Sequence, residues 1–107
     1  MADLISSPRP SLSPVPDSEL IESSRLGNQD AYGEIVRRYQ SLVCSIAYSR
    51  CHDLALSEDL AQEAFILGWR KLADLEDLNK FKGWICTIVR SLASRASQRS
   101  ASHMGHA

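Results

Sequence analysis

The sequence has few of the features that mark membrane, secreted or disulfide-rich proteins. None of its apolar runs approaches the length of about 20 residues that a bilayer-spanning helix needs. The N-terminus has no basic segment followed by an apolar one, which is the pattern of a secretory signal peptide. The three cysteines are odd in number and include no C-x-x-C pair. These absences predict a cytoplasmic protein that has no membrane partner and no disulfide framework.

The cysteines also give little support for a metal site. Cys44 and Cys51 lie two helical turns apart, roughly 10 Å, which is too far for a disulfide. Cys51 is followed by His52, but this spacing is poor for a zinc site. We therefore interpret all three cysteines as small core residues and expect neither a metal nor a cofactor.

The sequence also gives little support for a catalytic site. There is no glycine-rich phosphate loop, and two of the three histidines lie close to the C-terminus. Cys51 and His52 are adjacent, so on a helix their side chains diverge by about 100° and cannot form a nucleophile–base pair by themselves. No Glu-x-x-His motif of the kind found in di-metal bundles is present. The sequence predicts a protein that is not an enzyme.

The chain divides into three parts by composition. Residues 1–16 hold all four prolines and several serines, which predicts a flexible leader. Residues 17–99 carry apolar positions at helical spacing, no segment alternates with period two, and residues 100–107 are expected to be a disordered tail. The fold class is therefore all-α, a compact bundle of one short and three longer helices.

The helix limits are predicted from capping residues and from breaks in the apolar pattern. The first helix is expected to start at a cap from Asp17 or Ser18 and to end before Gly27. The other three are expected from a cap at Asn28 or Asp30 to about Arg50, from a cap at Ser57 to Leu72, and from a cap at Asn79 to about Arg99. The acidic segment 73–80 is expected to be a loop that can include one turn.

The third predicted helix has an outer face that core packing does not explain. Its apolar side accounts for residues such as Phe65 and Trp69. The opposite side carries one continuous stripe of charged, polar and apolar residues: Asp59, Gln62, Glu63, Ile66 and Arg70. An apolar residue set among charges suits a contact with a helix of another protein, while a solvated face is the other interpretation. The pattern alone leaves both open.

The fourth predicted helix has the opposite charge. No acidic residue follows Asp77, and the helix carries four basic residues: Lys82, Arg90, Arg95 and Arg99. Small polar residues, among them Gly83, Thr87 and Ser91, flank its apolar stripe, which permits close approach to a phosphate backbone. The formal net charge is only −1, so any contact with nucleic acid has to come from such a local patch. A solvated basic face is again the alternative.

The order of these elements resembles a known family. The run EDLAQEAFILGWRKL, an acidic connection, and then FKGWICTIVRSLASRASQR are similar to region 2 of bacterial RNA polymerase sigma factors of the extracytoplasmic-function type. The upstream run GNQDAYGEIVRRYQSLVCSIAY resembles the start of that domain. The most specific pieces are D-L-A-Q-E-A-F and F-x-x-W-I-x-x-I-x-R at the expected separation. The resemblance covers residues 17–99.

The resemblance implies two binding roles. Region 2 docks on the clamp helices of the largest subunit of core RNA polymerase, which implies Asp59, Gln62, Glu63, Ile66 and Arg70 as polymerase-binding residues. It also recognises and melts the minus-ten element of promoter DNA by capturing an unstacked base. The residues implied for this DNA contact are Asn79, Lys80, Lys82, Thr87, Arg90, Ser91 and Arg95.

The sequence departs from the family pattern at two of these positions. The family usually has Asn where this chain has Ser91, and often Asp where it has Arg95. The alternative function is therefore a helical interaction module that retains only polymerase or anti-sigma binding, without promoter melting. An anti-sigma factor is accordingly a further candidate partner. The domain that carries a helix-turn-helix in the family has no counterpart in these 107 residues.

Overall fold

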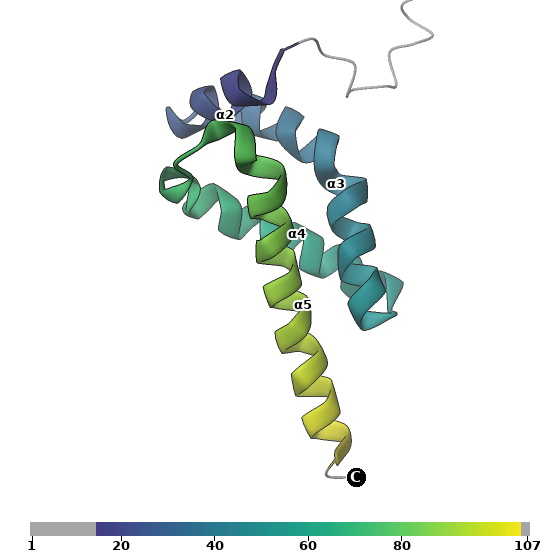
Figure 1. Cartoon of the computed structure of the whole chain (residues 1–107). Helices are drawn as coiled ribbons and strands as arrows, with labels where there is room; N and C mark the ends of the chain where they lie inside the picture. Colours follow the sequence, from purple (N-terminus) through teal and green to yellow (C-terminus); the bar gives the residue numbers. More distant parts are fainter. Residues whose placement is uncertain (1–14, 106–107) are drawn as a thin grey trace, which may run out of the picture.

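The computed structural model describes the backbone of residues 15–105 and the side chains of residues 15–96 (Figure 1). The chain forms α2 (Asp17–Arg25), α3 (Gln29–Cys51), α4 (Leu54–Arg70), the 3-10 turns η2 (Leu72–Asp74) and η3 (Leu78–Lys80), and α5 (Phe81–Gly105). No strand occurs within residues 15–105. The predicted all-α fold of one short and three longer helices is confirmed.

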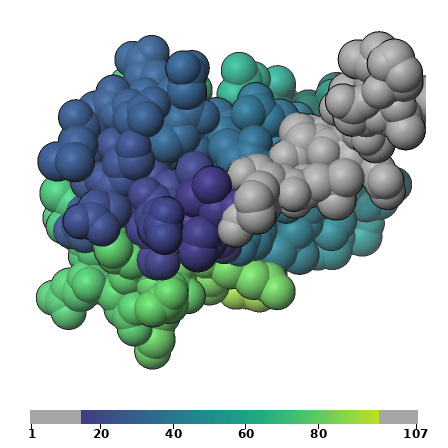
Figure 2. All heavy atoms as spheres, turned by 90° about the horizontal axis from the view of Figure 1, so that it is seen from above, coloured from purple at the N-terminus to yellow at the C-terminus, as the bar shows by residue number. Residues whose placement is uncertain are grey.

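α3 is the central helix of the bundle. It packs against α2, α4 and α5, and α4 packs in turn against α5. Seen from above, α2 lies between α3 and the green segment that contains η3 (Figure 2). α5 crosses the bundle and extends beyond the other helices at its C-terminal end (Figure 1). No helix in the described part of the chain is long and apolar enough to cross a membrane.

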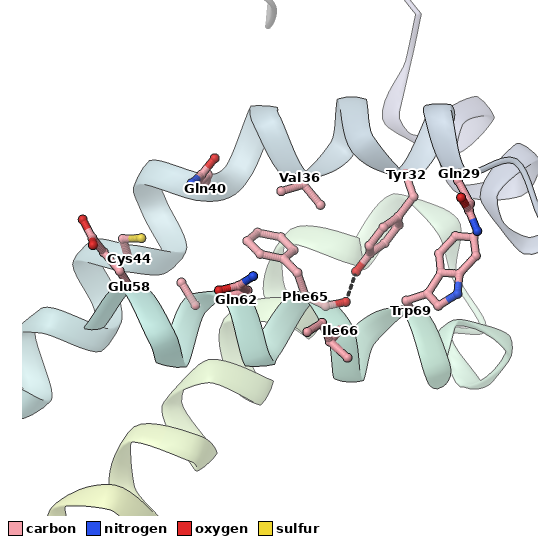
Figure 3. A pocket seen from close by; sticks show the side chains of 11 residues that line it. Gln29, Tyr32, Val36, Gln40, Cys44, Glu58, Gln62, Phe65, Ile66 and Trp69 are labelled. Atoms are coloured by element: carbon pink, nitrogen blue, oxygen red, sulfur yellow. Dashed lines mark hydrogen bonds between the residues drawn. The ribbon is translucent and has the colours of Figure 1, made fainter. Parts of the chain in front are cut away.

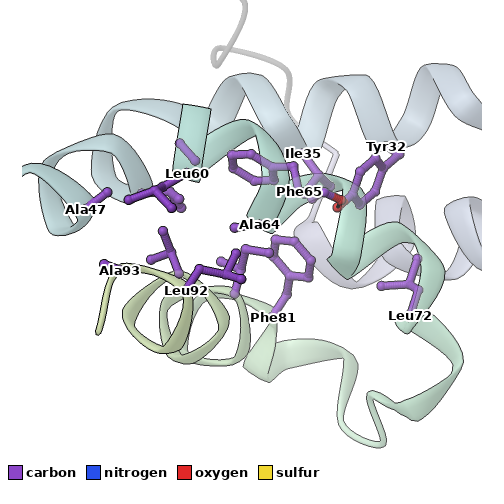
Figure 4. Close-up of a cluster of buried hydrophobic side chains, with 14 of the residues drawn as sticks. Tyr32, Ile35, Ala47, Leu60, Ala64, Phe65, Leu72, Phe81, Leu92 and Ala93 are labelled. Atoms are coloured by element: carbon purple, nitrogen blue, oxygen red, sulfur yellow. Dashed lines mark hydrogen bonds between the residues drawn. The ribbon is translucent and has the colours of Figure 1, made fainter. Parts of the chain in front are cut away.

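The core is built from the apolar stripes that the sequence predicts (Figure 4). Ile35 and Val43 of α3 and Ile85 and Val89 of α5 are fully buried, and Phe81 at the start of α5 is almost so. Cys86 is buried, while Cys44 and Cys51 pack against the edge of the core, as predicted. Within the described residues, no group of three or more His, Cys, Asp or Glu is placed to hold a metal ion.

Gly68 permits the closest approach in this core. A Cβ atom at this position would lie 3.0 Å from Cδ1 of Ile85 and 3.0 Å from the hydroxyl oxygen of Tyr32. The Tyr32 hydroxyl uses this space to donate a hydrogen bond of 2.5 Å to the carbonyl oxygen of Phe65. The absence of a side chain therefore lets α3 and α5 approach the same turn of α4.

The helix starts differ in part from the predictions. Asn28 caps α3, since its side chain accepts from the backbone N–H of Ala31 at 3.1 Å. The cap at Asp17 or Ser18 is wrong, because Pro16 holds that position without a side-chain bond. The Asp17 carboxylate instead binds Arg38 and Tyr39 of α3. Burial of Tyr39 and this hydrogen bond raise the pKa of the Tyr39 hydroxyl to about 12.

Two further caps lie upstream of the residues predicted. α4 begins at Leu54, and Asp53 caps it by accepting from the N–H of Leu56 at 3.0 Å. Ser57 is fully buried inside the helix, where its hydroxyl donates to the carbonyl of Leu54. Asp77, not Asn79, supplies the side-chain cap before α5, accepting from the N–H of Asn79 at 3.0 Å. In both cases the helical backbone begins upstream of the expected cap, and an aspartate at that start accepts from an unpaired N–H: Asp53 caps α4, and Asp77 caps η3, which leads into α5.

α5 also runs further than the apolar pattern indicates. Its backbone is helical through Gly105, past Arg99, where the domain was expected to end. The segment from Ser97 to Met104 contains neither proline nor glycine, so nothing in it breaks the helix. The expected tail, 100–107, is thus helical up to Gly105, and its last two residues lie outside the described part. Most of the expected leader, 1–16, also lies outside it.

Candidate functional site

The outer stripe of α4 lies on the surface as predicted. All five of its residues are exposed, and Ile66 exposes 49% of its surface. Among residues 15–96, no ion pair or hydrogen bond engages the side chains of Asp59, Glu63 or Arg70. These charges are therefore available for a partner, and an exposed Ile66 at their centre offers it an apolar contact.

Beside this stripe, a groove of about 760 Å³ runs between α3 and α4 (Figure 3). Its apolar lining comes from both helices and includes Tyr32, Val36, Phe65 and Trp69. Gln62 and Ile66 belong both to the stripe and to the groove, so the two features form one continuous surface. Polar side chains also line it: Gln29, Gln40, Cys44, Glu58 and Gln62.

The groove wall on α3 was not predicted from the sequence. The spacing of Tyr32 and Val36 follows the apolar stripe of α3 and predicts core residues, and Tyr32 is indeed buried in the core at 8% exposure. Figure 3 shows them directed towards α4, where the separation between the two helices leaves them at the bottom of a groove. Only the crossing of α3 and α4 decides this, and periodicity along one helix carries no such information.

The aromatic groups of the groove contact each other and the backbone of α4. The rings of Tyr32 and Trp69 lie with centroids 5.0 Å apart and are tilted by 57°. Burial raises the pKa of the Tyr32 hydroxyl well above its ordinary value, so the group stays protonated and continues to donate to Phe65. The Trp69 side chain is half-buried and lies near Gln29 at one end of the groove (Figure 3).

A second hollow, of about 610 Å³, lies between the loop that follows α4 and the first turns of α5. Lys80 and Thr87, both expected to contact DNA, line it, and Trp84 contributes an aromatic wall. Nothing lies within 4 Å of the Cβ position of Gly83, so this part of the wall is open. The remaining lining residues are Asp74, Leu75, Glu76 and Asp77. Asn79 is exposed beside Lys80 but does not line the hollow.

The loop side of this hollow is fixed by a few specific contacts. Leu72 and Leu75 are buried in the core at 3% and 4% exposure. Asp77 binds the backbone N–H of Asn79, as described above. The guanidinium of Arg25, at the end of α2, donates to the carbonyl of Ala73 at 3.2 Å. The shape of the hollow therefore depends on α2 as well as on the residues that line it.

The predicted DNA-binding residues of α5 fall into two groups. Thr87, Ser91 and Arg95 follow one another at intervals of four along one exposed side, and Arg90 is exposed next to them. Arg95 donates to the hydroxyl of Ser91 at 3.2 Å, so these two side chains act as a pair. Lys82 is exposed too, but it points about 140° away from Thr87 around the helix. Lys82 is thus separated from Thr87, Ser91 and Arg95, while Arg90 lies between the two groups.

Comparison with known proteins identifies this arrangement. The family model described as sigma-70 region 2 matches residues 35–102, more than half of the chain. The chain belongs to the sigma-70 region 2 family. No solved structure matches the chain.

Curated relatives are sigma factors as well. A Xanthomonas campestris protein named a probable RNA polymerase sigma factor, RfaY, is 46% identical over 67 residues, covering 63% of this chain and 17% of that protein. The ECF RNA polymerase sigma factor BldN of Streptomyces coelicolor is 31% identical, covering 71% of this chain and 29% of its own. The ECF RNA polymerase sigma factor SigW of Bacillus subtilis is 31% identical, covering 67% of this chain and 38% of its own. The chain therefore has an extracytoplasmic-function type of region 2 and spans less than half the length of these relatives.

Proposed function

We propose that this sigma region 2 domain binds core RNA polymerase through α4 and binds the promoter minus-ten element through the loop 74–80 and α5. Such a role is one of binding, without an enzymatic step, and is performed in the cytoplasm beside the polymerase. The observation that carries the proposal is the separation of the two exposed surfaces. The unpaired charges on α4 and the hollow at Lys80 and Thr87 lie on different helices, so both partners can be bound at once.

The polymerase contact is proposed for the stripe that contains Glu63 and Ile66. A clamp helix laid along α4 would cover the exposed apolar side chain of Ile66, while Asp59 and Glu63 face basic residues of the partner. The partner we propose is the paired clamp helices of the largest subunit. The exposure of these five side chains along one side of a single helix supports this proposal.

The DNA contact is proposed for the hollow and the adjoining cations. Unstacking a base costs a few kcal/mol, and a stacking contact with an aromatic side chain returns about 1–3 kcal/mol. Trp84 is the aromatic group that lines the hollow, and Lys80 is the nearest cation. Arg90 and Arg95 are exposed further along α5, and we propose that they contact phosphates of the non-template strand.

The pair formed by Ser91 and Arg95 bears on how the strand is read. Ser91 has a hydroxyl where the family usually has the amide of Asn. Arg95 has a guanidinium where the family often has the carboxylate of Asp. Because the Ser91 hydroxyl already accepts from Arg95, we propose that the pair contributes a phosphate contact more than a base contact. The same departure favours a second function, an interaction module that binds polymerase or an anti-sigma factor and does not melt promoters.

One experiment separates these two functions. A fluorescent single strand that carries a minus-ten element is titrated with the full chain in complex with core polymerase. The proposed function predicts saturable binding and photocrosslinks to residues between Lys80 and Ser91. The interaction module predicts that core polymerase is bound while the strand shows the same weak affinity with and without the chain.

A further inference from the structure

One cluster of charged and polar side chains is not used by the proposed function. It joins the start of α2 to α3 and consists of Asp17, Glu34, Arg38 and Tyr39. We propose that this Asp17 cluster positions the hollow between the loop and α5 for DNA, by holding both the loop wall and the Trp84 wall of that hollow in place. The inference rests on the proposed role of the hollow.

The Asp17 carboxylate has two partners on α3. One oxygen accepts from the guanidinium of Arg38 at 2.6 Å, and the other accepts from the hydroxyl of Tyr39. Glu34 accepts from the same guanidinium at 3.3 Å, and the side chains of Glu34 and Arg38 are each only 13% exposed. Hydrogen bonds that involve charged groups are stronger than neutral ones and fix orientation as well as distance. The cluster therefore determines how the first turn of α2 lies on α3.

The apolar contacts of α2 do not fix its direction by themselves. Ile21 is fully buried in the core, and its neighbour Leu20 packs against the core from the edge. Both lie near the middle of the helix, and apolar burial is not directional, so these two residues set the depth of α2 and leave it free to turn about them. Directional bonds at the ends of the helix are what fix its direction.

α2 carries the position of the cluster to the loop wall of the hollow. The helix spans roughly 13 Å at 1.5 Å per residue, and Asp17 lies at its start. At its other end, the guanidinium of Arg25 binds the carbonyl of Ala73, and α2 also packs against η3. α2 thus contacts the loop both where it begins and where it leads into α5. A turn of α2 about its middle would move both contacts.

The Tyr39 ring carries the same cluster to the α5 wall of the hollow. Its centroid lies 5.8 Å from that of the Phe81 ring, and the planes are tilted by 48°. Phe81, the first residue of α5, is 1% exposed and lies with its ring centroid 5.8 Å from that of Trp84. Because interiors are close-packed, a turn of the Tyr39 ring would displace Phe81 and with it Trp84. Asp17, which holds the Tyr39 hydroxyl, is therefore a positioning residue that does not itself contact DNA.

The test compares two variants with the unaltered full chain. Asp17→Asn keeps the shape of the side chain and removes the charge that Arg38 and Tyr39 bind. Tyr39→Phe is the milder change, because it removes the hydroxyl and keeps the ring against Phe81, and it decides the question if Asp17→Asn does not fold. The matched controls are Glu19→Gln, an exposed acid on α2, and Tyr48→Phe, an exposed tyrosine on α3.

The first measurement is the indole N–H signal of Trp84 in nuclear magnetic resonance spectra, taken well below the unfolding midpoint of each protein. Asp17→Asn and Tyr39→Phe should both shift this signal, and the two controls should leave it unchanged. The second is the affinity of the chain, in complex with core polymerase, for a single strand that carries a minus-ten element and for a scrambled strand. Asp17→Asn should weaken binding to the minus-ten strand by about tenfold, the effect of one hydrogen bond to a charged group.

The preference for the minus-ten strand separates positioning from simple stabilisation. Misplaced walls should lower the ratio of the two affinities, while binding to core polymerase stays the same because the cluster bonds only α2 to α3. If both variants unfold more easily and yet keep the Trp84 signal, the affinity and the ratio, the cluster only stabilises the fold and the proposal is overturned.

The same measurements distinguish this inference from the proposed function. If the unaltered chain with core polymerase does not prefer the minus-ten strand while Trp84 moves in both variants, the DNA role of the hollow is wrong and the positioning of its walls stands. If the unaltered chain prefers that strand and both variants match it in signal and affinity, the inference is wrong and the DNA role stands.

Discussion

The outer stripe of α4 and the loop between α4 and α5 present their candidate functional residues in different ways. On α4, regular helical spacing alone brings Asp59, Glu63 and Ile66 to one side. The loop has no such repeat, and its hollow exists because Leu72 and Leu75 are buried and Arg25 reaches across from α2. A surface on a helix is thus robust to change elsewhere, whereas a surface on a loop depends on distant contacts.

The largest expected effect is that of removing a loop anchor. Leu75→Ala deletes a buried side chain and should cost roughly 2–5 kcal/mol of the free energy of unfolding, measured by chemical denaturation. Single-stranded minus-ten DNA should then bind weakly to the fraction that remains folded, because the hollow loses its shape. Polymerase binding by that fraction should persist. Leu54→Ala, at a site that is 65% exposed, is the matched control and should change stability little. Equal loss of both activities in Leu75→Ala would contradict the comparison.

The second largest effect is expected for a change in the outer stripe of α4. Glu63→Lys reverses an exposed charge that is unpaired within residues 15–96, and should weaken binding to the clamp helices by about tenfold or more. The affinity for single-stranded DNA in the absence of polymerase should stay the same. Glu22→Lys reverses an exposed charge on α2 and serves as the control. Undiminished binding of Glu63→Lys to the clamp helices would remove α4 from the proposed interface.

A smaller effect is expected on the basic side of α5. Arg95→Ala should weaken single-stranded DNA binding several-fold and should lower the slope of log affinity against log salt by about 0.7, the value for one lost phosphate contact. Lys71→Ala removes an exposed cation at the end of α4 and should leave that slope unchanged. A loss that varies with the identity of one base, at constant salt slope, would show that Arg95 reads sequence.

The smallest effect tests the contact between α2 and the loop. Arg25→Gln removes the bond to the Ala73 carbonyl, which is exposed and worth about 0.5–1.5 kcal/mol. The backbone N–H of Leu75 should exchange with solvent several-fold faster, and DNA binding should fall by a factor of about 2–5. Arg37→Gln, on the exposed side of α3, is the control. Unchanged exchange at Leu75 would mean that the buried leucines alone position the loop.

Helical periodicity was a sufficient guide to most of the fold. It placed the apolar stripes, the all-α class and the exposed stripe of α4, because each depends on residues three or four apart on one helix. It was a poor guide to helix starts at Ser57 and Asn79. There the choice between neighbouring caps depends on which carboxylate or hydroxyl reaches an unpaired N–H, and Asp53 and Asp77 do so.

In the candidate site, too, some features could be predicted from one helix and others depend on how the helices pack. Gly68 and Tyr32 look unremarkable in sequence, yet their close approach sets how α3 and α4 meet, and so how the groove is formed. The separation of Lys82 from Thr87, by contrast, follows from the spacing of five residues within one helix once α5 is known to begin at Phe81. Residues that act within one helix can be predicted, while those that act between helices need the crossing geometry.

The four helices, the side of each that is buried, and the charges left on α4 and α5 could all be predicted, since they follow from local spacing and burial of apolar surface. The groove lined by Tyr32 and Trp69 and the contact of Arg25 with the loop at Ala73 could not. These contacts join residues more than 30 positions apart, and their distances are set by how the helices cross.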